Sequence, residues 1–233
     1  MSNINIWNLK KINTILEKFM ANWQELLLDL VQKENVVFST SFSLEDQIIT
    51  DFIAKNHLNI EIFTIDTGRI FNESYEVWQR TLDIYDLKIK TYYPNQFDLE
   101  GFVKINGINA FYDSVSLRKK CCYIRKIGPL KRALKNKDFW ISGIRKEHSQ
   151  SRSQKEISEF DDNLKITKFY PLLNLKEDEI WQIIRANNIP YNKLYDQGFE
   201  SVGCAPCTRS GFARGGRWWW ESEGRKECGL HFN

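Results

Sequence analysis

The sequence predicts an α/β protein with a mostly parallel, doubly wound sheet. Short apolar runs of β-branched and aromatic residues alternate along the chain with longer amphipathic segments, and a serine-rich turn joins the first such pair. Strands that alternate with helices favour parallel pairing, with helices on both faces of the sheet. The length of 233 residues suits one domain with its own core. We therefore expect a single domain over residues 1–233.

The predicted elements follow in order from the amino terminus. Within an N-terminal segment of residues 1–33, apolar side chains at helical spacing predict an amphipathic helix over residues 7–32. Residues 35–41 predict a buried strand, and Leu44–Lys55 predict a helix whose entry, Ser43 to Asp46, fits a capping box. Further strands are expected at 60–65, 88–92, 139–143 and 166–170, and further helices at 72–85, 116–135 and 176–187.

The last part of the chain, residues 191–233, has a different composition. It is rich in Gly and Arg and contains three consecutive tryptophans, Trp218 to Trp220. We expect it to form an irregular C-terminal active-site region that closes over the sheet, with the tryptophans packed against the sheet.

Composition disfavours several classes of protein. No apolar run approaches the roughly 18 residues that a membrane-spanning helix needs, and the first ten residues lack a signal-peptide pattern. The net charge of +3 does not indicate a nucleic-acid-binding protein. We therefore expect a cytoplasmic protein with no membrane and no nucleic-acid partner, and a homo-oligomer is left open.

The five cysteines are the most informative residues for function. Cys121 and Cys122 are adjacent, Cys204 and Cys207 form a CxxC motif, and Cys228 stands alone near the end of the chain. In a reducing cytoplasm, such pairs are more often ligands or redox groups than structural disulfides. The favoured interpretation is that four of the cysteines are ligands of one metal site and that the fifth is a free, reactive thiol. The alternative is a set of scattered buried thiols, which two tight pairs make less plausible.

Positive charge gathers around both cysteine pairs. Residues 118–137 contain nine Lys or Arg residues and no acid, and residues 203–217 contain Arg209, Arg214 and Arg217, again with no acid. A fold that unites the four thiols therefore concentrates positive charge beside them, which favours an anionic substrate. For Lys135 and Lys137, a solvated helix face is the simpler interpretation.

Two predicted strands end in polar turns. The first turn runs from Ser39 to Asp46, and Ser39 and Ser41 offer hydroxyl and amide groups to a phosphate or sulfate. The second contains Asp66, Thr67 and Gly68, which suit a ribose or base edge. Ligands of doubly wound sheets bind beyond the carboxyl ends of the strands. The alternative is that both segments are only caps and turns.

These motifs together resemble the assimilatory phosphosulfate reductases, and among them the iron–sulfur, thioredoxin-dependent adenylyl-sulfate (APS) reductases. The resemblance covers nearly all of the chain after the N-terminal helix, and the order CC, CxxC, ECGLH is its most specific part. It is carried by residues 39–46, 66–71, 121–126, 143–152, 204–207, 214–220 and 227–231.

The resemblance implies an adenine nucleotide α-hydrolase-like fold and a [4Fe-4S] cluster held by Cys121, Cys122, Cys204 and Cys207. Four cysteines can also hold zinc, but structural zinc sites usually draw their ligands from two spaced pairs. Cys228 then remains as the nucleophile. By resemblance, it attacks the sulfur of adenylyl sulfate, AMP leaves, and thioredoxin or glutaredoxin releases sulfite from the S-sulfocysteine intermediate.

The resemblance also implies the residues that bind substrate. Lys126 matches a lysine that bridges cluster and substrate, and Arg214 and Arg217 match arginines that clamp the substrate. Arg145 and Arg152, after the strand that ends in Gly143, are further candidates. His231 is a candidate for positioning the sulfate, the alternative being that it only caps the tail.

The sequence departs from the family pattern at two points. Ser43 stands where the nucleotide loop is expected to carry glycine, and only six residues separate Cys207 from Arg214.

The sequence leaves three other functions as alternatives. Phosphoadenylyl sulfate (PAPS) is the first alternative substrate, alone or together with APS. An ATP-pyrophosphatase-type enzyme, such as a tRNA thiolation protein, requires a glycine-rich loop that residues 39–46 lack. A metal-stabilised nucleic-acid-binding module leaves Cys228 without a role.

Overall fold

The computed structural model describes residues 23–211 and 215–221. Its six described strands form one sheet in the order β3-β2-β1-β4-β6-β5. Every neighbouring pair is parallel except β5 and β6, which are antiparallel. This confirms the predicted mostly parallel sheet. The strands are β1 Val36–Thr40, β2 Glu61–Ile65, β3 Ile89–Tyr92, β4 Phe139–Ile141, β5 Ser158–Asp161 and β6 Ile166–Phe169.

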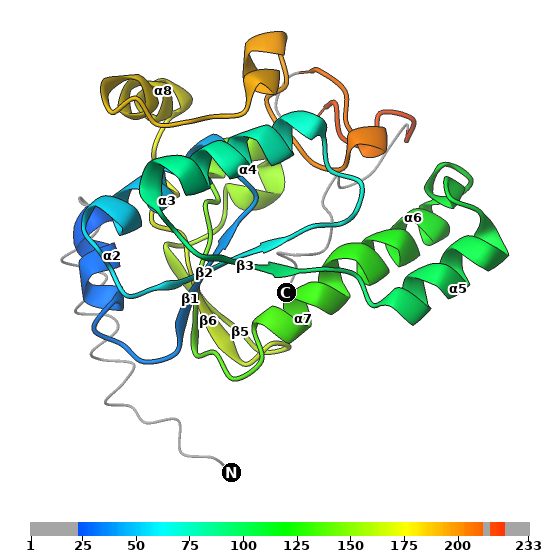
Figure 1. Ribbon diagram of the computed structural model, residues 1–233, viewed down its shortest axis with the longest axis horizontal. Coiled ribbons are helices and arrows are strands. Elements are labelled where there is room, and N and C mark those ends of the chain that lie inside the picture. The colour runs from blue at the N-terminus through cyan, green and yellow to red at the C-terminus, as the bar shows by residue number, and fades with distance from the viewer. Residues whose placement is uncertain (1–22, 212–214, 222–233) are drawn as a thin grey trace.

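Helices cover both faces of the sheet (Figure 1). On one face α2, α3 and α8 pack with Val36 and Phe38 in one apolar core, and α7 packs on the other face with Val37 and Trp140. Successive residues of β1 thus point into opposite cores, as expected for a strand buried on both sides. The helices are α2 Trp23–Leu30, α3 Leu44–Lys55, α4 Asn72–Tyr85, α5 Gln96–Asn106, α6 Val115–Cys122, α7 Gly128–Ala133 and α8 Glu177–Ala186.

Most predicted elements are confirmed to within a few residues, and α3 and α4 have the predicted bounds. The predicted helix over residues 7–32 falls largely outside the described residues, which contain its last part as α2. Two elements were not predicted. These are α5, whose one buried residue is Phe102, and the antiparallel strand β5, whose sequence is mostly polar.

The predicted helix at 116–135 is three segments rather than one. A π-helical turn, η2 Tyr123–Ile127, separates α6 from α7, and the amide of Gly128 donates to the carbonyl of Tyr123, five residues earlier. A π turn inserts one residue into a helix and often lies at a functional site. Here it begins directly after the two adjacent cysteines.

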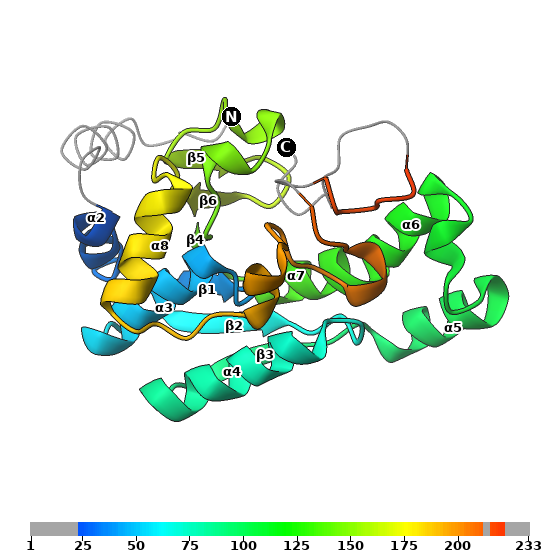
Figure 2. The same ribbon diagram turned by 90° about the horizontal axis from the view of Figure 1, so that it is seen from above.

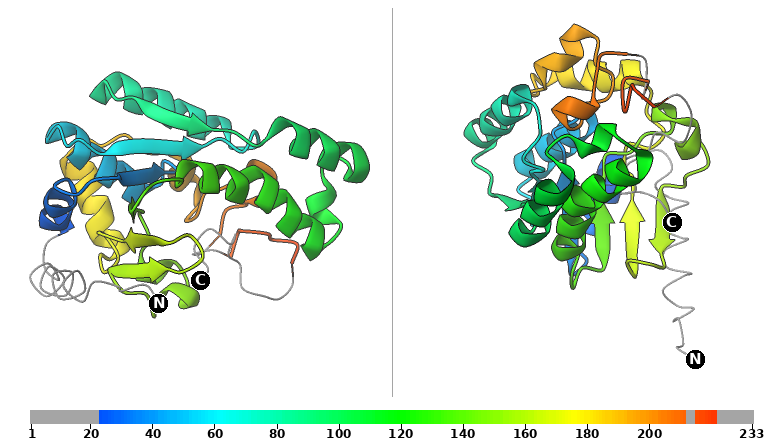
Figure 3. Two further views of the ribbon diagram at one scale, coloured as in Figure 1. Left: turned by 90° about the horizontal axis from the view of Figure 1, so that it is seen from below. Right: turned by 90° about the vertical axis from the view of Figure 1, so that its right-hand side faces the viewer.

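The described part of residues 191–221 lies over the carboxyl ends of the strands. It is coloured from orange to red in Figures 2 and 3, and it lies beside α6. Its only regular elements among the described residues are short 3₁₀ turns, η5 Lys193–Gln197 and η6 Ala205–Cys207. No described helix is long and apolar enough to cross a lipid bilayer.

Candidate active site

A cleft opens at the carboxyl end of β1. The chain passes from β1 to β2 and β3 on one side and then to β4 on the other, and such a switch point is where doubly wound sheets bind ligands. The cleft has about 870 Å³ of empty space, part of it open to solvent. Among the residues that line it are Ser39, Ser41, Thr67, Lys126, Ser142 and Gly203.

Hydrogen bonds fix the loop after β1. The Ser41 amide and hydroxyl both donate to Asp46 Oδ2, each at 2.7 Å. The Asp46 amide donates to Ser43 Oγ, so half of the predicted capping box is present, while the Asp46 carboxylate holds Ser41 instead of completing the box. Trp140 Nε1 donates to Ser39 Oγ at 2.8 Å. Burial raises the pKa of Asp46 despite the Ser41 hydrogen bonds.

The loop after β1 also contains a strained residue. Phe42 has φ of +60°, which is rare for a bulky side chain. Its ring is buried and stacks on Trp78 at 5.4 Å between centroids. Strain of this kind persists only where the surroundings hold it, and it is common at binding sites.

The turn after β2 is a second wall of the site. Asp66 Oδ1 accepts a hydrogen bond from the Gly68 amide, and Tyr75 donates its hydroxyl to Asp66 Oδ2 at 2.8 Å. Gly68 has φ of +68°, a conformation that favours glycine. Asp66 thus forms the turn, whereas Thr67 lines the cleft and its Oγ1 lies 3.3 Å from Cys204 Sγ.

The four described cysteines gather around one small cavity next to the cleft. Cys121 and Cys122 end α6, and Cys204 and Cys207 flank the η6 turn. The turn is attached to the β2 end, because the Ala205 amide donates to the Arg69 carbonyl at 2.8 Å. None of the four described cysteines forms a disulfide bond.

Burial disfavours the thiolate forms of two of these cysteines. Burial and the neighbouring Cys204 and Cys122 raise the pKa of Cys207 to about 12. Burial also raises the pKa of Cys121, where the Arg125 guanidinium opposes the shift. A bound metal centre would offset this effect, and four cysteines around one cavity are a donor set that fits a thiophilic metal. No three described His, Cys, Asp or Glu side chains are placed to hold a single metal ion.

The cavity and the cleft share one cation, because Lys126 lines both. Its neighbour Arg125 is buried, and its Nη1 donates to the Thr67 carbonyl at 2.5 Å. Arg125 therefore connects the cysteine cavity to the turn beside the cleft. Sequence reasoning missed Arg125, although its position beside Lys126 in the basic segment was a signal.

Two arginines, Arg118 and Arg217, contact the same tryptophan. The guanidinium carbons of Arg118 and Arg217 lie 4.6 and 5.1 Å from the Trp218 ring centroid. Arg118 also donates to both Glu221 carboxylate oxygens, at 2.8 and 2.9 Å. Arg217 Nη1 donates to the carbonyl of Val202, which lines the cleft. Sequence reasoning singled out Arg217 but missed Arg118 and Glu221.

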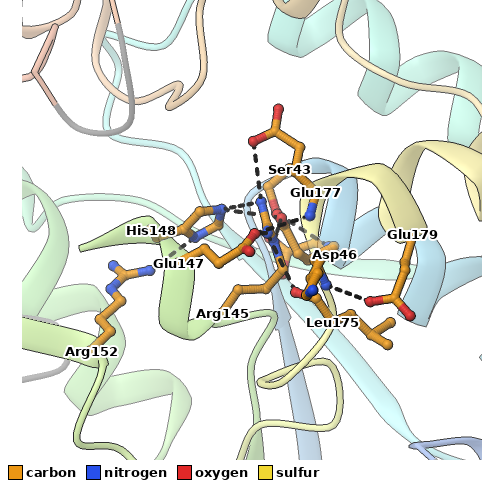
Figure 4. Close-up of polar contacts among 11 residues, drawn as sticks. Ser43, Asp46, Arg145, Glu147, His148, Arg152, Leu175, Glu177 and Glu179 are labelled. Carbon is orange, nitrogen blue, oxygen red and sulfur yellow. Dashed lines mark hydrogen bonds and ion pairs between the residues drawn. The ribbon is translucent and has the colours of Figure 1, made fainter. Parts of the chain in front are cut away.

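Arg145 and Arg152 are placed apart from the residues that line the cleft. Buried Arg145 contacts the carboxylates of Glu45 at 2.6 Å and Glu147 at 2.8 Å, and His148 lies between it and Arg152 (Figure 4). Burial works to raise the pKa of Glu45, but His148 and Arg145 outweigh it and hold this pKa far below its ordinary value. Glu45 belongs to the first turn of α3, so this cluster braces the helix that starts beside the cleft.

Three predicted site residues, Arg214, Cys228 and His231, lie outside the described residues, and their roles stay predictions. Of the other candidates, Ser39, Ser41, Thr67 and Lys126 line the cleft. Gly68 lies in the adjoining turn, and the four cysteines line the neighbouring cavity.

The chain is similar to several known proteins. Residues 35–210 match the family described as the phosphoadenosine phosphosulfate reductase domain. The adenosine 5'-phosphosulfate reductase of Neisseria meningitidis serogroup B is 41% identical over 236 residues, which cover 97% of this chain and 96% of the relative. That of Allochromatium vinosum is 41% identical over 212 residues, which cover 89% of this chain and 83% of the relative.

Solved structures share the fold. A phosphoadenylyl-sulfate reductase from Candida auris, in a phosphate complex, matches with a TM-score of 0.72 and 26% identity over 90% of this chain and 98% of that one. FMN adenylyltransferase from Candida glabrata matches with a TM-score of 0.55 and 14% identity over 84% of this chain and 66% of that one, which shows the fold alone. The fold is thus adenine nucleotide α-hydrolase-like, as expected, and the chain belongs to the phosphoadenosine phosphosulfate reductase family, with adenosine 5'-phosphosulfate reductases among its relatives at 41% identity.

Proposed function

We propose that this protein reduces adenylyl sulfate to sulfite and AMP, with thioredoxin or glutaredoxin as the electron donor. The observation that carries the proposal is that Lys126 lines both the cleft at the strand ends and the four-cysteine cavity. One cation shared by the two sites suits a reaction in which an oxyanion is held beside a metal centre. The relatives named adenosine 5'-phosphosulfate reductase support the same assignment.

The proposed cofactor is a [4Fe-4S] cluster with Cys121, Cys122, Cys204 and Cys207 as its ligands. Structural zinc sites usually draw their ligands from two spaced pairs and not from adjacent residues such as Cys121 and Cys122. Iron–sulfur clusters are held by Cys thiolates, and the four described cysteines that line one cavity would supply four of them. When bound, the cluster would supply a fixed charge beside the substrate and would join α6 to the η6 turn.

Cys228 is the proposed nucleophile. Its thiolate attacks the sulfur of adenylyl sulfate, a sulfur–sulfur bond forms, and the sulfur–oxygen bond to the phosphate breaks. AMP leaves with that electron pair. A thioredoxin thiolate then attacks Cys228 Sγ, and sulfite leaves with the electrons of the sulfur–sulfur bond. The second thioredoxin thiol resolves the mixed disulfide, so the dithiol supplies both electrons.

The reach of the chain is compatible with this role. Glu221 is fixed to Arg118, which lines the cysteine cavity. Six residues separate Glu221 from Cys228, and the seven steps from one Cα to the next can span up to about 25 Å. The thiol can therefore meet the substrate and then a protein donor without a rearrangement of the sheet.

Cations offset the repulsion between thiolate and substrate. Lys126 and Arg217 are proposed to hold the sulfate and phosphate oxygens, with Arg214 and His231 completing the group. Among the described residues that line the cleft, Lys126 is the one Lys or Arg, and Asp46 adds a carboxylate. The relatives named adenosine 5'-phosphosulfate reductase favour APS over PAPS as the substrate. Arg145 and Arg152 are proposed to act on the site through Glu45 and His148.

A sulfite-release assay with reduced thioredoxin tests the function. APS is expected to yield sulfite and AMP, with PAPS at least about tenfold poorer. Cys228→Ser is expected to keep about four irons and four sulfides per chain while sulfite production falls to background. An active Cys228→Ser protein, a fully active zinc-only protein, or the absence of sulfite with both nucleotides contradicts the proposal.

A further inference from the structure

Arg118 connects three parts of the molecule. It is 5% exposed and belongs to α6, one helical turn before Cys122. Its Nε and Nη2 atoms donate to the two oxygens of Glu221, and its guanidinium lies on the Trp218 ring. Burial works to lower the pKa of Arg118, but Glu221 and the Cys122 thiol beside it outweigh this and raise it. One side chain thus joins the cysteine helix to residues 218–221.

Trp218 is held in a strained position. Its φ is +44°, in the left-handed region that bulky residues avoid. Its amide donates to the Cys207 carbonyl at 3.0 Å, and its side chain is 1% exposed. Strain at a bulky residue persists only when its surroundings fix it. The Cys207 carbonyl and the Arg118 guanidinium are two of the groups that do so.

Trp218 in turn supports Arg217. The Arg217 guanidinium lies on the same indole and against Gly203, where a Cβ atom would be 2.3 Å from its central carbon. Arg217 is 5% exposed, and its Nε has no hydrogen-bond partner among the described residues. Gly203 and Val202 line the cleft. Contacts therefore run without a break from Cys122 through Arg118, Trp218 and Arg217 to the cleft.

We propose that Arg118 is a positioning residue that makes substrate binding by Arg217 depend on whether the four-cysteine site is filled. The inference rests on the proposed function for the identity of the substrate. Joining the four thiols fixes the end of α6 relative to the η6 turn. This holds Arg118 where its planar fork meets both Glu221 oxygens and Trp218 together, and a two-point ion pair tolerates little displacement. By reciprocity, bound nucleotide slows loss of the cluster.

Binding of adenylyl sulfate to the Cys228→Ser protein tests the proposal without turnover. Titration calorimetry is expected to show about tenfold tighter binding to the cluster-loaded form than to the cluster-free form. With Arg118→Gln added, the loaded form should bind about tenfold more weakly, and cluster removal should then change affinity less than about twofold. Equal affinity of the parent protein with and without cluster overturns the proposal, and so does a loaded Arg118→Gln protein of parental affinity.

Arg209 provides a matched control. Its guanidinium lies 5.0 Å from the neighbouring Trp219 ring, but it is exposed and is not among the residues that line the cleft. Arg209→Gln removes the same charge and the same kind of contact, and it should preserve the dependence of affinity on the cluster. If Arg209→Gln abolishes that dependence, net charge and not the Arg118 contacts is responsible, and the proposal is wrong.

Two further measurements separate positioning from folding. Iron content and melting temperature of Arg118→Gln should match the parent. If Arg118→Gln does not take up the cluster, Glu221→Gln replaces it in the experiment. Glu221→Gln leaves Arg118 in place but breaks the ion pair between the two residues, so it should give the same loss of affinity for adenylyl sulfate. Parental affinity in loaded Glu221→Gln overturns the proposal. Hydrogen exchange of the Arg209 and Trp218 amides, bonded to the Gly216 and Cys207 carbonyls, should accelerate in either variant.

The hydrogen-exchange measurement does not depend on the identity of the substrate. If the parent protein binds no adenylyl sulfate, the proposed function fails, while exchange still decides whether Arg118 holds this segment. Unchanged exchange in both variants overturns the positioning role.

Discussion

At the scale of single residues, two glycines beside the cleft, Gly143 and Gly203, are required by space and not by backbone conformation. A Cβ atom at Gly143 would lie 2.4 Å from Asp46 Oδ1 and 2.9 Å from Glu45 Cβ, at the start of α3. A Cβ atom at Gly203 would meet the Arg217 guanidinium instead. Both neighbours are polar groups that shape the site. Glycine at these positions therefore lets charged side chains approach the backbone beside the cleft.

Replacement of Gly203 should disturb function more than stability. In Gly203→Ala, the flexible end of Arg217 must move, while the backbone around it can stay in place. The KM for adenylyl sulfate is expected to rise about tenfold, with a change in melting temperature below about 3 °C. Steady-state kinetics and thermal unfolding measure the two effects. Gly101→Ala is the control, because no atom lies within 4 Å of a Cβ there. An unchanged KM in Gly203→Ala contradicts the expected contact.

The Glu45 ion pairs should stabilise the fold in a pH-dependent way. The pKa of Glu45 is lowered on folding, so its stabilisation is complete above its ordinary pKa of 4.5 and is lost as pH falls through the lower folded value. Glu45→Gln should cost about 3 kcal/mol of unfolding free energy at neutral pH, because Arg145 is left buried without this partner. The difference from the parent should shrink below about pH 4.5.

Urea unfolding of iron-free protein at a series of pH values measures this difference without interference from an acid-labile cluster. Glu147→Gln is the matched control. Glu147 contacts the same Arg145 at 2.8 Å, but its side chain is 49% exposed, so its loss should cost less than about 1 kcal/mol. A Glu45→Gln difference that stays constant down to about pH 3 would mean that Glu45 does not titrate as its surroundings indicate.

At the scale of elements, the π turn after α6 accounts for the adjacent cysteines. Cys121, Cys122, Arg125 and Lys126 all line the cysteine cavity. In a regular α-helix, consecutive residues point about 100° apart, so these four positions spread over a wide arc. The η2 turn widens the helix at Tyr123–Ile127 and changes how its residues are directed. Two ligands and two cations can therefore face one cavity from a single helical run.

Sequence patterns predicted most elements but not this turn. The apolar residues on each side of the π turn keep their helical spacing when one residue is inserted between them. The spacing over residues 116–135 therefore predicted a continuous helix. The helix α5 was missed because most of its apolar residues, such as Phe97 at 80% exposure, do not face a core. The cysteine motifs predicted which residues gather at the cavity. The fixed partners of Ser39 and Ser41 could not be predicted, because they depend on Trp140 and Asp46 side-chain geometry.

Deletion of Tyr123 should remove the proposed cluster site while the fold persists. The loss of one residue restores α-helical hydrogen bonding and rotates α6 by about 100° relative to α7. Iron content is expected to fall below about one per chain, with far-UV circular dichroism close to the parent. Tyr123 is exposed, so Tyr123→Ala keeps the chain length at little cost in packing and serves as the control with full iron content. Full iron content in the deletion protein would show that the π turn is dispensable.

At the scale of the whole molecule, the site joins segments that are far apart in the sequence. The two cysteine pairs are separated by the 81 residues between Cys122 and Cys204. Two polar contacts are among those that join these regions of the protein. The Tyr112 hydroxyl donates to the Pro206 carbonyl, and Arg118 forms an ion pair with Glu221. Phe63, Leu130 and Trp140 of one apolar core also line the cleft. The four cysteines instead pack with Phe111 and Trp218 in a cluster of their own. The sheet and the cysteine cavity are therefore stabilised by largely separate sets of contacts.

The predicted concentration of positive charge is only partly local to the site. Arg118, Arg125 and Lys126 line the cysteine cavity, whereas Lys137 pairs with Glu61 at 3.1 Å at the start of β2. Charge spacing along the sequence could predict that a basic segment exists. It could not assign each cation to a face of the helix, because the π turn changes that assignment.

Removal of the proposed cluster should therefore loosen one part of the molecule more than the rest. A ligand that binds only the folded state stabilises it, so chelation of iron from the loaded protein should lower the melting temperature by at least about 5 °C. Hydrogen exchange should accelerate in residues 202–221 and at the end of α6. Exchange in β1 and α3 should stay unchanged, because Phe38 and Ile49 belong to the core under α8. Uniform acceleration over the whole chain would instead mean that sheet and site unfold as one unit.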